Sequence, residues 1–155
     1  MINSPVSKED LGPVVKTLQV RIPVEAAFRL LTEGFGRWWP LDSHSVSLEE
    51  AAACTLEAEA GGRIYEVHQD GRQFEWGRVL VWEPPHRLVF TWHPGRDAES
   101  GQEVEVTFQS EPGGTRVVLE HRGWEHLGER AAAVRQNYVS GWDIVLGKYQ
   151  ALGHP

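Results

Sequence analysis

The chain has 155 residues, of which 41% are hydrophobic and 24% charged, the composition of one globular domain folded in water. Its net charge of −7, with no basic run, argues against binding to nucleic acid or to anionic membranes. Cys54 is the only cysteine, so an internal disulfide and a cysteine-ligated zinc site are excluded. No apolar segment resembles a secretory signal or a membrane-spanning helix. We therefore expect one cytoplasmic domain over 1–155, with 1–13 as a loose lead-in.

The first predicted elements are a strand and two short helices. Apolar residues alternate along 14–22, which predicts a strand with one mainly apolar face. Pro23 suits the first position of a helix, and the apolar spacing after it predicts a short helix over 24–32. A second short helical turn is predicted over 37–40, and 41–53 shows no clear pattern.

Six more strands are predicted, because short runs of β-branched and aromatic residues alternate with glycine and proline turns. They are placed near 53–59, 62–68, 73–83, 86–93, 102–110 and 114–122. Their short connections favour an antiparallel meander. An apolar stripe at steps of three or four residues then predicts one long helix over about 127–152. Gly141 lies beside this stripe, which indicates either close approach of another backbone or space left open.

This order of elements predicts an α+β fold in which a curved antiparallel sheet of about seven strands wraps around the C-terminal helix. The apolar face of a single sheet needs a cover, and only the last helix is long enough to provide it. A strongly curved sheet cannot close flush along the whole helix. We therefore expect a cavity at one end, near the short helices, that binds a small hydrophobic or aromatic molecule.

Several short motifs follow one another in a characteristic order. They are 22–28 (IPVEAAF), 37–39 (RWW), 61–66 (GGRIYE), 76–79 (WGRV), 83–88 (EPPHRL), 90–92 (FTW), 115–117 (TRV) and the pairs 123–124 and 141–142 (GW). Together they resemble the START and birch-pollen-allergen-like (SRPBCC) superfamily, and within it the domain type named after the activator of heat-shock-protein-90 ATPase (AHSA-type). The resemblance covers about 14–152 and implies a helix-grip fold.

The resemblance leaves several functions open, since the superfamily includes lipid carriers, hormone and flavonoid binders, polyketide cyclases and co-chaperones. We rank ligand binding first, as a carrier, sensor or stress-related module. A co-chaperone-like interaction module is the second hypothesis, and a large exposed apolar patch would favour it. The co-chaperones carry a further N-terminal domain for the chaperone contact, for which this chain has no room. The third hypothesis is a cyclase or dehydratase, which needs polar groups such as His121 and Tyr138 converging in the cavity.

The candidate ligand-binding residues are mostly aromatic side chains on the predicted helices and on the inner strand faces. They are Phe28, Leu31, Trp39, Tyr65, Phe90, Trp92, His121, Tyr138 and Trp142. The seven tryptophans are also compatible with plain core packing or with a homodimer interface. His121 is singled out because alternation places it on the inner face of its strand, although a structural, hydrogen-bonded histidine is the simpler interpretation.

Catalytic nucleophiles, metals and cofactors have no sequence support. The histidines show no metal-ligand spacing, and Cys54 has no cationic neighbour that would activate it. Glutamates on the predicted strands are expected mostly on the solvated face; they are Glu57, Glu59, Glu66, Glu75, Glu103 and Glu105. Glu75 and Arg63 are the exceptions that we consider for a buried carboxylate–arginine site.

Overall fold

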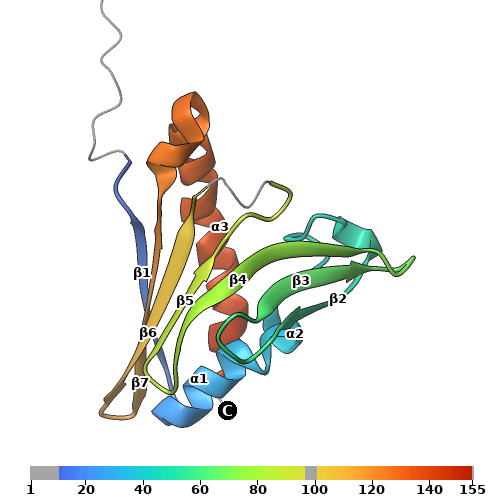
Figure 1. Ribbon diagram of the computed structural model, residues 1–155. Helices are drawn as coiled ribbons and strands as arrows, with labels where there is room; N and C mark the ends of the chain where they lie inside the picture. The colour runs from blue at the N-terminus through green and yellow to red at the C-terminus, as the bar shows by residue number, and fades with distance from the viewer. Residues whose placement is uncertain (1–10, 97–100, 155) are drawn as a thin grey trace, which may run out of the picture.

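The computed structural model describes residues 11–96 and 101–154. Seven strands form one antiparallel sheet in the order β1-β7-β6-β5-β4-β3-β2 (Figure 1). The strands are β1 (Val14–Val20), β2 (Ala51–Leu56), β3 (Arg63–His68), β4 (Gln73–Glu83), β5 (Arg87–Thr91), β6 (Glu103–Glu111) and β7 (Gly114–Arg122). The sheet curls around helix α3 (Ala131–Leu152), which confirms the predicted helix-grip fold.

Two short helices follow β1 and close one end of the curled sheet, near the C-terminal end of α3 (Figure 1). Helix α1 (Val24–Thr32) has the predicted bounds, and its apolar side chains at helical spacing, among them Phe28 and Leu31, are buried. Helix α2 (Phe35–Trp38) begins two residues earlier than the predicted turn. A 3-10 helix, η2 (Leu48–Glu50), lies in the segment that showed no sequence pattern.

Helix α3 begins at Ala131, four residues later than the apolar stripe predicted. Residues Trp124–Arg130 instead form the 3-10 segment η4. Gly128 interrupts the helical path with φ 61° and ψ −132°, a conformation in which glycine has no Cβ penalty. The apolar repeat in the sequence therefore extends across Gly128, where the helical conformation of the backbone is interrupted.

The sheet register arranges the inner face in rows. Leu88 on β5 pairs with Val106 on β6, which pairs with Leu119 on β7. Burying side chains of this size contributes roughly 1.5–3 kcal/mol each. The neighbouring row joins Phe90 to His121 through β6, so the only histidine on this face of β7 lies in the apolar core.

The long strand β4 bends across the sheet (Figure 1). Register shifts occur on its β3 side and between Val79 and Val81 on its β5 side. At Gly77 a Cβ atom would lie 1.8 Å from the carbonyl oxygen of Thr91, so only glycine lets the two strands approach here.

Six of the seven tryptophans are buried, and the seventh, Trp82, packs edge-on against Phe28 at 5.0 Å between ring centroids. Trp38 and Trp39 both face inward. Core packing, one of the two interpretations of the tryptophans, therefore accounts for most of them, and Trp82 is half-buried. Within residues 11–96 and 101–154, no helix is long and apolar enough to cross a membrane.

Candidate functional site

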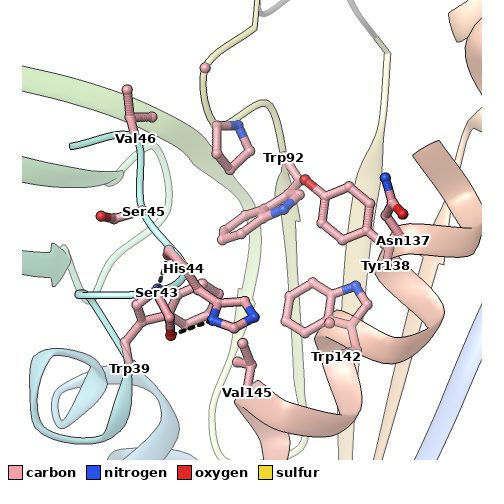
Figure 2. A pocket seen from close by; sticks show the side chains of 13 residues that line it. Trp39, Ser43, His44, Ser45, Val46, Trp92, Asn137, Tyr138, Trp142 and Val145 are labelled. Carbon is pink, nitrogen blue, oxygen red and sulfur yellow. Dashed lines mark hydrogen bonds between the residues drawn. The ribbon is translucent and has the colours of Figure 1, made fainter. Parts of the chain in front are cut away.

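A pocket of about 480 Å³ opens between the loop after α2, the segment after β5 and helix α3 (Figure 2). This volume lies within the range of about 300–1,000 Å³ that is usual for small-molecule sites. The lining residues are Trp39, Ser43, His44, Ser45, Val46, Trp92, Pro94, Gly95, Asn137, Tyr138, Gly141, Trp142 and Val145. The wall is largely apolar and carries polar groups at separate points, the usual composition of an organic ligand site.

Three indole rings form the aromatic part of the wall. The centroid of Trp92 lies 5.6 Å from that of Trp39 and 5.6 Å from that of Trp142. The rings of Trp39 and Trp142 are 6.1 Å apart. Trp39 directly follows α2, Trp92 directly follows β5 and Trp142 is on α3, so only the folded chain assembles the three rings. Flat aromatic surfaces of this kind favour stacked or edge-to-face contacts with an aromatic ligand.

Gly141 leaves part of the pocket open. A Cβ atom added at this position would meet no heavy atom within 4 Å. Of the two interpretations of this glycine, close backbone approach is therefore wrong and open space is right. The missing side chain contributes to the volume beside Trp142.

The loop that forms one wall is held by a buried carboxylate. Glu66 on β3 is fully buried and accepts hydrogen bonds from the backbone N–H of Val46 at 2.5 Å and of Ser47 at 2.9 Å. It also accepts one from the indole N–H of Trp76 at 2.7 Å. Three donors compensate the burial of the charge, which fixes the loop against the sheet.

His44 projects from this loop into the pocket (Figure 2). Its Nδ1 lies 2.7 Å from the hydroxyl of Ser43, and its Nε2 faces away from that serine, toward the space beside Trp142. The indole N–H of Trp39 donates a hydrogen bond of 2.6 Å to the backbone carbonyl of His44. A wall residue of the pocket thus also holds the histidine in place.

The other polar group with chemical capacity is the hydroxyl of Tyr138 on α3. Arg96 donates a hydrogen bond of 3.1 Å to this oxygen. Burial raises the pKa of Tyr138, and the nearby charge of Arg96 offsets this only in part, so the hydroxyl keeps its proton. The buried Nε1 of Trp92 lies beside the same hydroxyl (Figure 2) and has no well-formed hydrogen bond to the described residues.

His121 lies behind the pocket wall rather than in it. Its Nδ1 accepts a 2.9 Å hydrogen bond from the indole N–H of Trp142, and its Nε2 lies 3.0 Å from the side-chain oxygen of Gln102. Burial, together with the charge of Arg96, lowers the pKa of His121 to about 3. It is therefore a neutral group that orients Trp142, and it does not line the cavity.

The predicted site residues separate into three groups. Four of them line the pocket: Trp39, Trp92, Tyr138 and Trp142. Leu31 and Phe90 border a void of about 10 Å³ deeper in the core, and Phe28 packs against Phe108. Tyr65 lies on the outer face of β3 under the guanidinium of Arg63, away from the pocket.

Sequence reasoning missed Ser43 and His44, because they lie in a loop without periodicity. It also placed Glu66 among the solvated glutamates, which is wrong. Ile64 and Glu66 are two residues apart on β3 and share its inner face, so strict alternation along the strand would have indicated that Glu66 is buried.

Glu75 and Arg63, which we considered for a buried carboxylate–arginine site, do not form one. Glu75 binds Arg78 at 2.6 Å and Arg63 pairs with Glu57. Among the described residues no His, Cys, Asp and Glu group could hold a metal ion.

Comparison with known proteins identifies the family. Residues 21–151 match the family described as activator of Hsp90 ATPase homolog 1-like protein. The chain belongs to this family. Among curated proteins, no sequence matches it.

Solved structures of several relatives share the fold of this Hsp90-activator-like domain. Protein MLL2253 from Mesorhizobium loti has a TM-score of 0.62 at 22% identity, over 90% of this chain and 95% of that one. An AHSA1-like protein from Aeromonas hydrophila has a TM-score of 0.59 at 23% identity, over 90% of each chain. Txn09, an anthrahydroquino-γ-pyrone synthase solved as a complex, is 34% identical with a TM-score of 0.57, over 95% of this chain and 90% of that one.

Proposed function

We propose that this protein binds a planar, phenolic, polyketide-type aromatic molecule in the pocket and closes a ring on it. The observation that carries the proposal is the joint presence of three indole walls and of polar groups that project between them, His44 and Tyr138. The aromatic walls suit a flat polycyclic ligand, and the polar groups suit proton transfer to and from it.

The relation to Txn09 supports the catalytic part of this proposal. That protein is a synthase of an anthrahydroquino-γ-pyrone and is 34% identical to this chain over nearly its whole length. A cavity of hydrocarbon and indole alone would favour a simple carrier. Here Ser43, His44, Asn137 and Tyr138 contribute polar groups to the lining, which a passive apolar carrier does not need.

The family name points to a different class of function, a contact with a chaperone. The exposed large apolar side chains of the described residues come from β1, the loop after α2, η2, β4 and α3; they are Val15, Val46, Leu48, Leu80, Ile144 and Leu152. Scattered exposed apolar residues are normal for monomeric proteins. The pocket therefore supports ligand chemistry more strongly than the surface supports a protein partner.

The binding step is tested with alizarin, a planar dihydroxyanthraquinone. We expect alizarin to quench the fluorescence of the pocket tryptophans and to bind with a stoichiometry of one. Gly141→Leu should abolish binding, because its side chain enters the open space of the pocket. Gly147→Leu is the matched control, since it is on the same helix and a Cβ there also meets nothing within 4 Å, but it does not line the pocket.

Both substitutions replace a helical glycine and gain up to about 1 kcal/mol of helix propensity, so neither is expected to impair folding. Equal alizarin affinity in the two variants would place the ligand elsewhere. Absence of binding to the wild-type protein would contradict the proposed function itself.

A further inference from the structure

His44 is the one side chain in the pocket lining with a basic ring nitrogen. The other polar lining groups are two serine hydroxyls, an asparagine amide and the Tyr138 hydroxyl. Burial keeps the proton on that tyrosine, so it can donate a hydrogen bond but not accept a proton. A base for chemistry inside this pocket must therefore be His44.

The hydroxyl of Ser43 holds one ring nitrogen of His44. It lies 2.7 Å from Nδ1 of His44 and 3.5 Å from the Pro40 carbonyl, which can only accept. The geometry accommodates the tautomer with the proton on Nδ1, in which His44 donates to this hydroxyl. Nε2, the nitrogen that faces the pocket in Figure 2, then carries the lone pair, and this is the tautomer that a base at this position requires.

The position of His44 is fixed by its neighbours before any ligand arrives. Its backbone N–H donates to the Pro40 carbonyl at 2.9 Å, and its own carbonyl accepts the Trp39 indole N–H at 2.6 Å. The next residues are held by Glu66 through the backbone of Val46 and Ser47. A catalytic group needs such preorganisation, because small misplacements cost large factors in rate.

A hydrogen-bond donor faces the pocket from the opposite wall, the hydroxyl of Tyr138 (Figure 2). Arg96 donates to the Tyr138 oxygen, and the enclosed Trp92 N–H lies beside the same oxygen, so the hydroxyl proton is left to donate elsewhere. A neutral donor backed by a positive charge suits an oxygen on which negative charge develops. Base and donor come from different elements, the loop after α2 and helix α3.

We propose that His44 is the catalytic base of this pocket, and that the hydroxyl of Tyr138 binds the carbonyl oxygen that becomes an enolate. This inference rests on the proposed function and specifies its substrate class. The substrate is an aryl ketone with a phenolic hydroxyl positioned to attack an α,β-unsaturated carbonyl group in the same molecule.

The reaction is an internal addition that conserves all atoms. Nε2 of His44 removes the phenolic proton, and the phenolate oxygen forms a bond to the β-carbon of the unsaturated ketone. The electron pair of the carbon–carbon π bond shifts to the bond between the α-carbon and the carbonyl carbon. The π pair of the carbonyl group moves to its oxygen, where Tyr138 donates a hydrogen bond. The proton on His44 then returns to the α-carbon. The product is an isomer of the substrate, so the step requires no oxidant, reductant or second substrate.

The test uses the simple chalcone that carries one hydroxyl ortho to its carbonyl group, which loses its absorbance band when it closes to flavanone. We expect the wild-type protein to accelerate this closure over buffer. His44→Gln should lower kcat about 10²–10⁴-fold with an unchanged KM, which is the usual contribution of a general base. Tyr138→Phe should lower kcat about 10²–10³-fold, the usual loss for one such donor.

His86→Gln is the matched control, because this histidine lies in the exposed turn between β4 and β5 and not in the pocket lining. It should close the chalcone at the wild-type rate. A wild-type midpoint of thermal unfolding for His44→Gln should show that its fold is intact, since His44 lies in a loop and outside the buried core.

Each contrary outcome identifies a different failure. A His44→Gln protein as fast as wild type overturns the role of His44 and leaves the proposed function standing. Calorimetric binding of the chalcone by wild-type protein without acceleration overturns ring closure, and the role of His44 with it. Failure to bind either the chalcone or alizarin overturns the proposed function.

Discussion

The indole N–H of Trp142 donates a 2.9 Å hydrogen bond to Nδ1 of His121. An indole nitrogen can only donate, so Nδ1 must be unprotonated and the proton of this imidazole must be on Nε2. That proton is donated to the oxygen of Gln102, which also accepts from Arg96 at 3.3 Å. A chain of hydrogen bonds thus links the pocket wall to a charged group at the open end of the sheet. It is satisfied only while His121 is neutral.

The first prediction concerns the pH dependence of stability. The pKa of His121 falls from 6.5 in the unfolded chain to about 3 in the folded protein. Between these two pH values the unfolded chain binds a proton at His121 and the folded protein does not. The free energy of unfolding should therefore fall as the pH is lowered below 6.5. At pH 5 the loss due to this residue is about 2 kcal/mol.

Urea denaturation of wild type and His121→Gln at pH 7 and pH 5 measures this effect. The variant should be less stable at pH 7 but should lose less on acidification. Measurements below pH 5 are avoided, because protonation of carboxylates whose pKa is lowered in the folded protein, such as Glu105, then also reduces the stability. An equal loss of stability in the two proteins would contradict a neutral, buried His121.

The second prediction concerns the carboxylate under the loop. In Glu66, one carboxylate oxygen accepts from Val46 and Trp76, and the other accepts from Ser47. Glu66→Gln replaces one of the two oxygens by an NH₂ group, which faces N–H donors and cannot accept from them. We expect a loss of about 1–3 kcal/mol in the free energy of unfolding, the usual cost of an unsatisfied buried polar group. Hydrogen exchange of the Val46 and Ser47 amides should also become faster.

Glu83→Gln is the control, since that carboxylate is exposed and pairs only with Arg87 across the β4–β5 turn. Exposed pairs of this kind contribute less than about 1 kcal/mol. Unchanged exchange at Val46 in Glu66→Gln would mean that the loop is held by other contacts, such as that between Trp39 and His44.

The third prediction concerns thiol reactivity. Burial, and to a smaller extent the charge of Glu66, raises the pKa of Cys54 to about 12. The thiolate is the reactive form, so the native protein should react very slowly with a disulfide reagent at pH 8. The chain unfolded in urea should react at the rate of a free cysteine, with one equivalent per chain. Rapid reaction of the native protein would show that β2 separates from α2 in solution.

Much of the fold could be predicted from the sequence, because its signals are local. Period-two alternation located the strands, and helical spacing located α1 with its final bounds. The start of α3 could not be predicted in this way, because hydrophobic spacing does not register the left-handed turn at Gly128. The inward face of His121 followed from alternation, and the same rule applied to Glu66 would have found the buried carboxylate.

The sequence by itself determined the family, the helix-grip order of elements and the aromatic character of the pocket, because these depend on neighbours in the chain. The tertiary structure decided which aromatic residues meet: it brought Trp39, Trp92 and Trp142 together and left Tyr65 on the outer face. It also placed His44 opposite Tyr138, although 94 residues separate them in the printed sequence. Such pairs depend on sheet curvature and on buried hydrogen bonds between distant segments. Neither of these features produces a periodic pattern in the sequence from which it could be predicted.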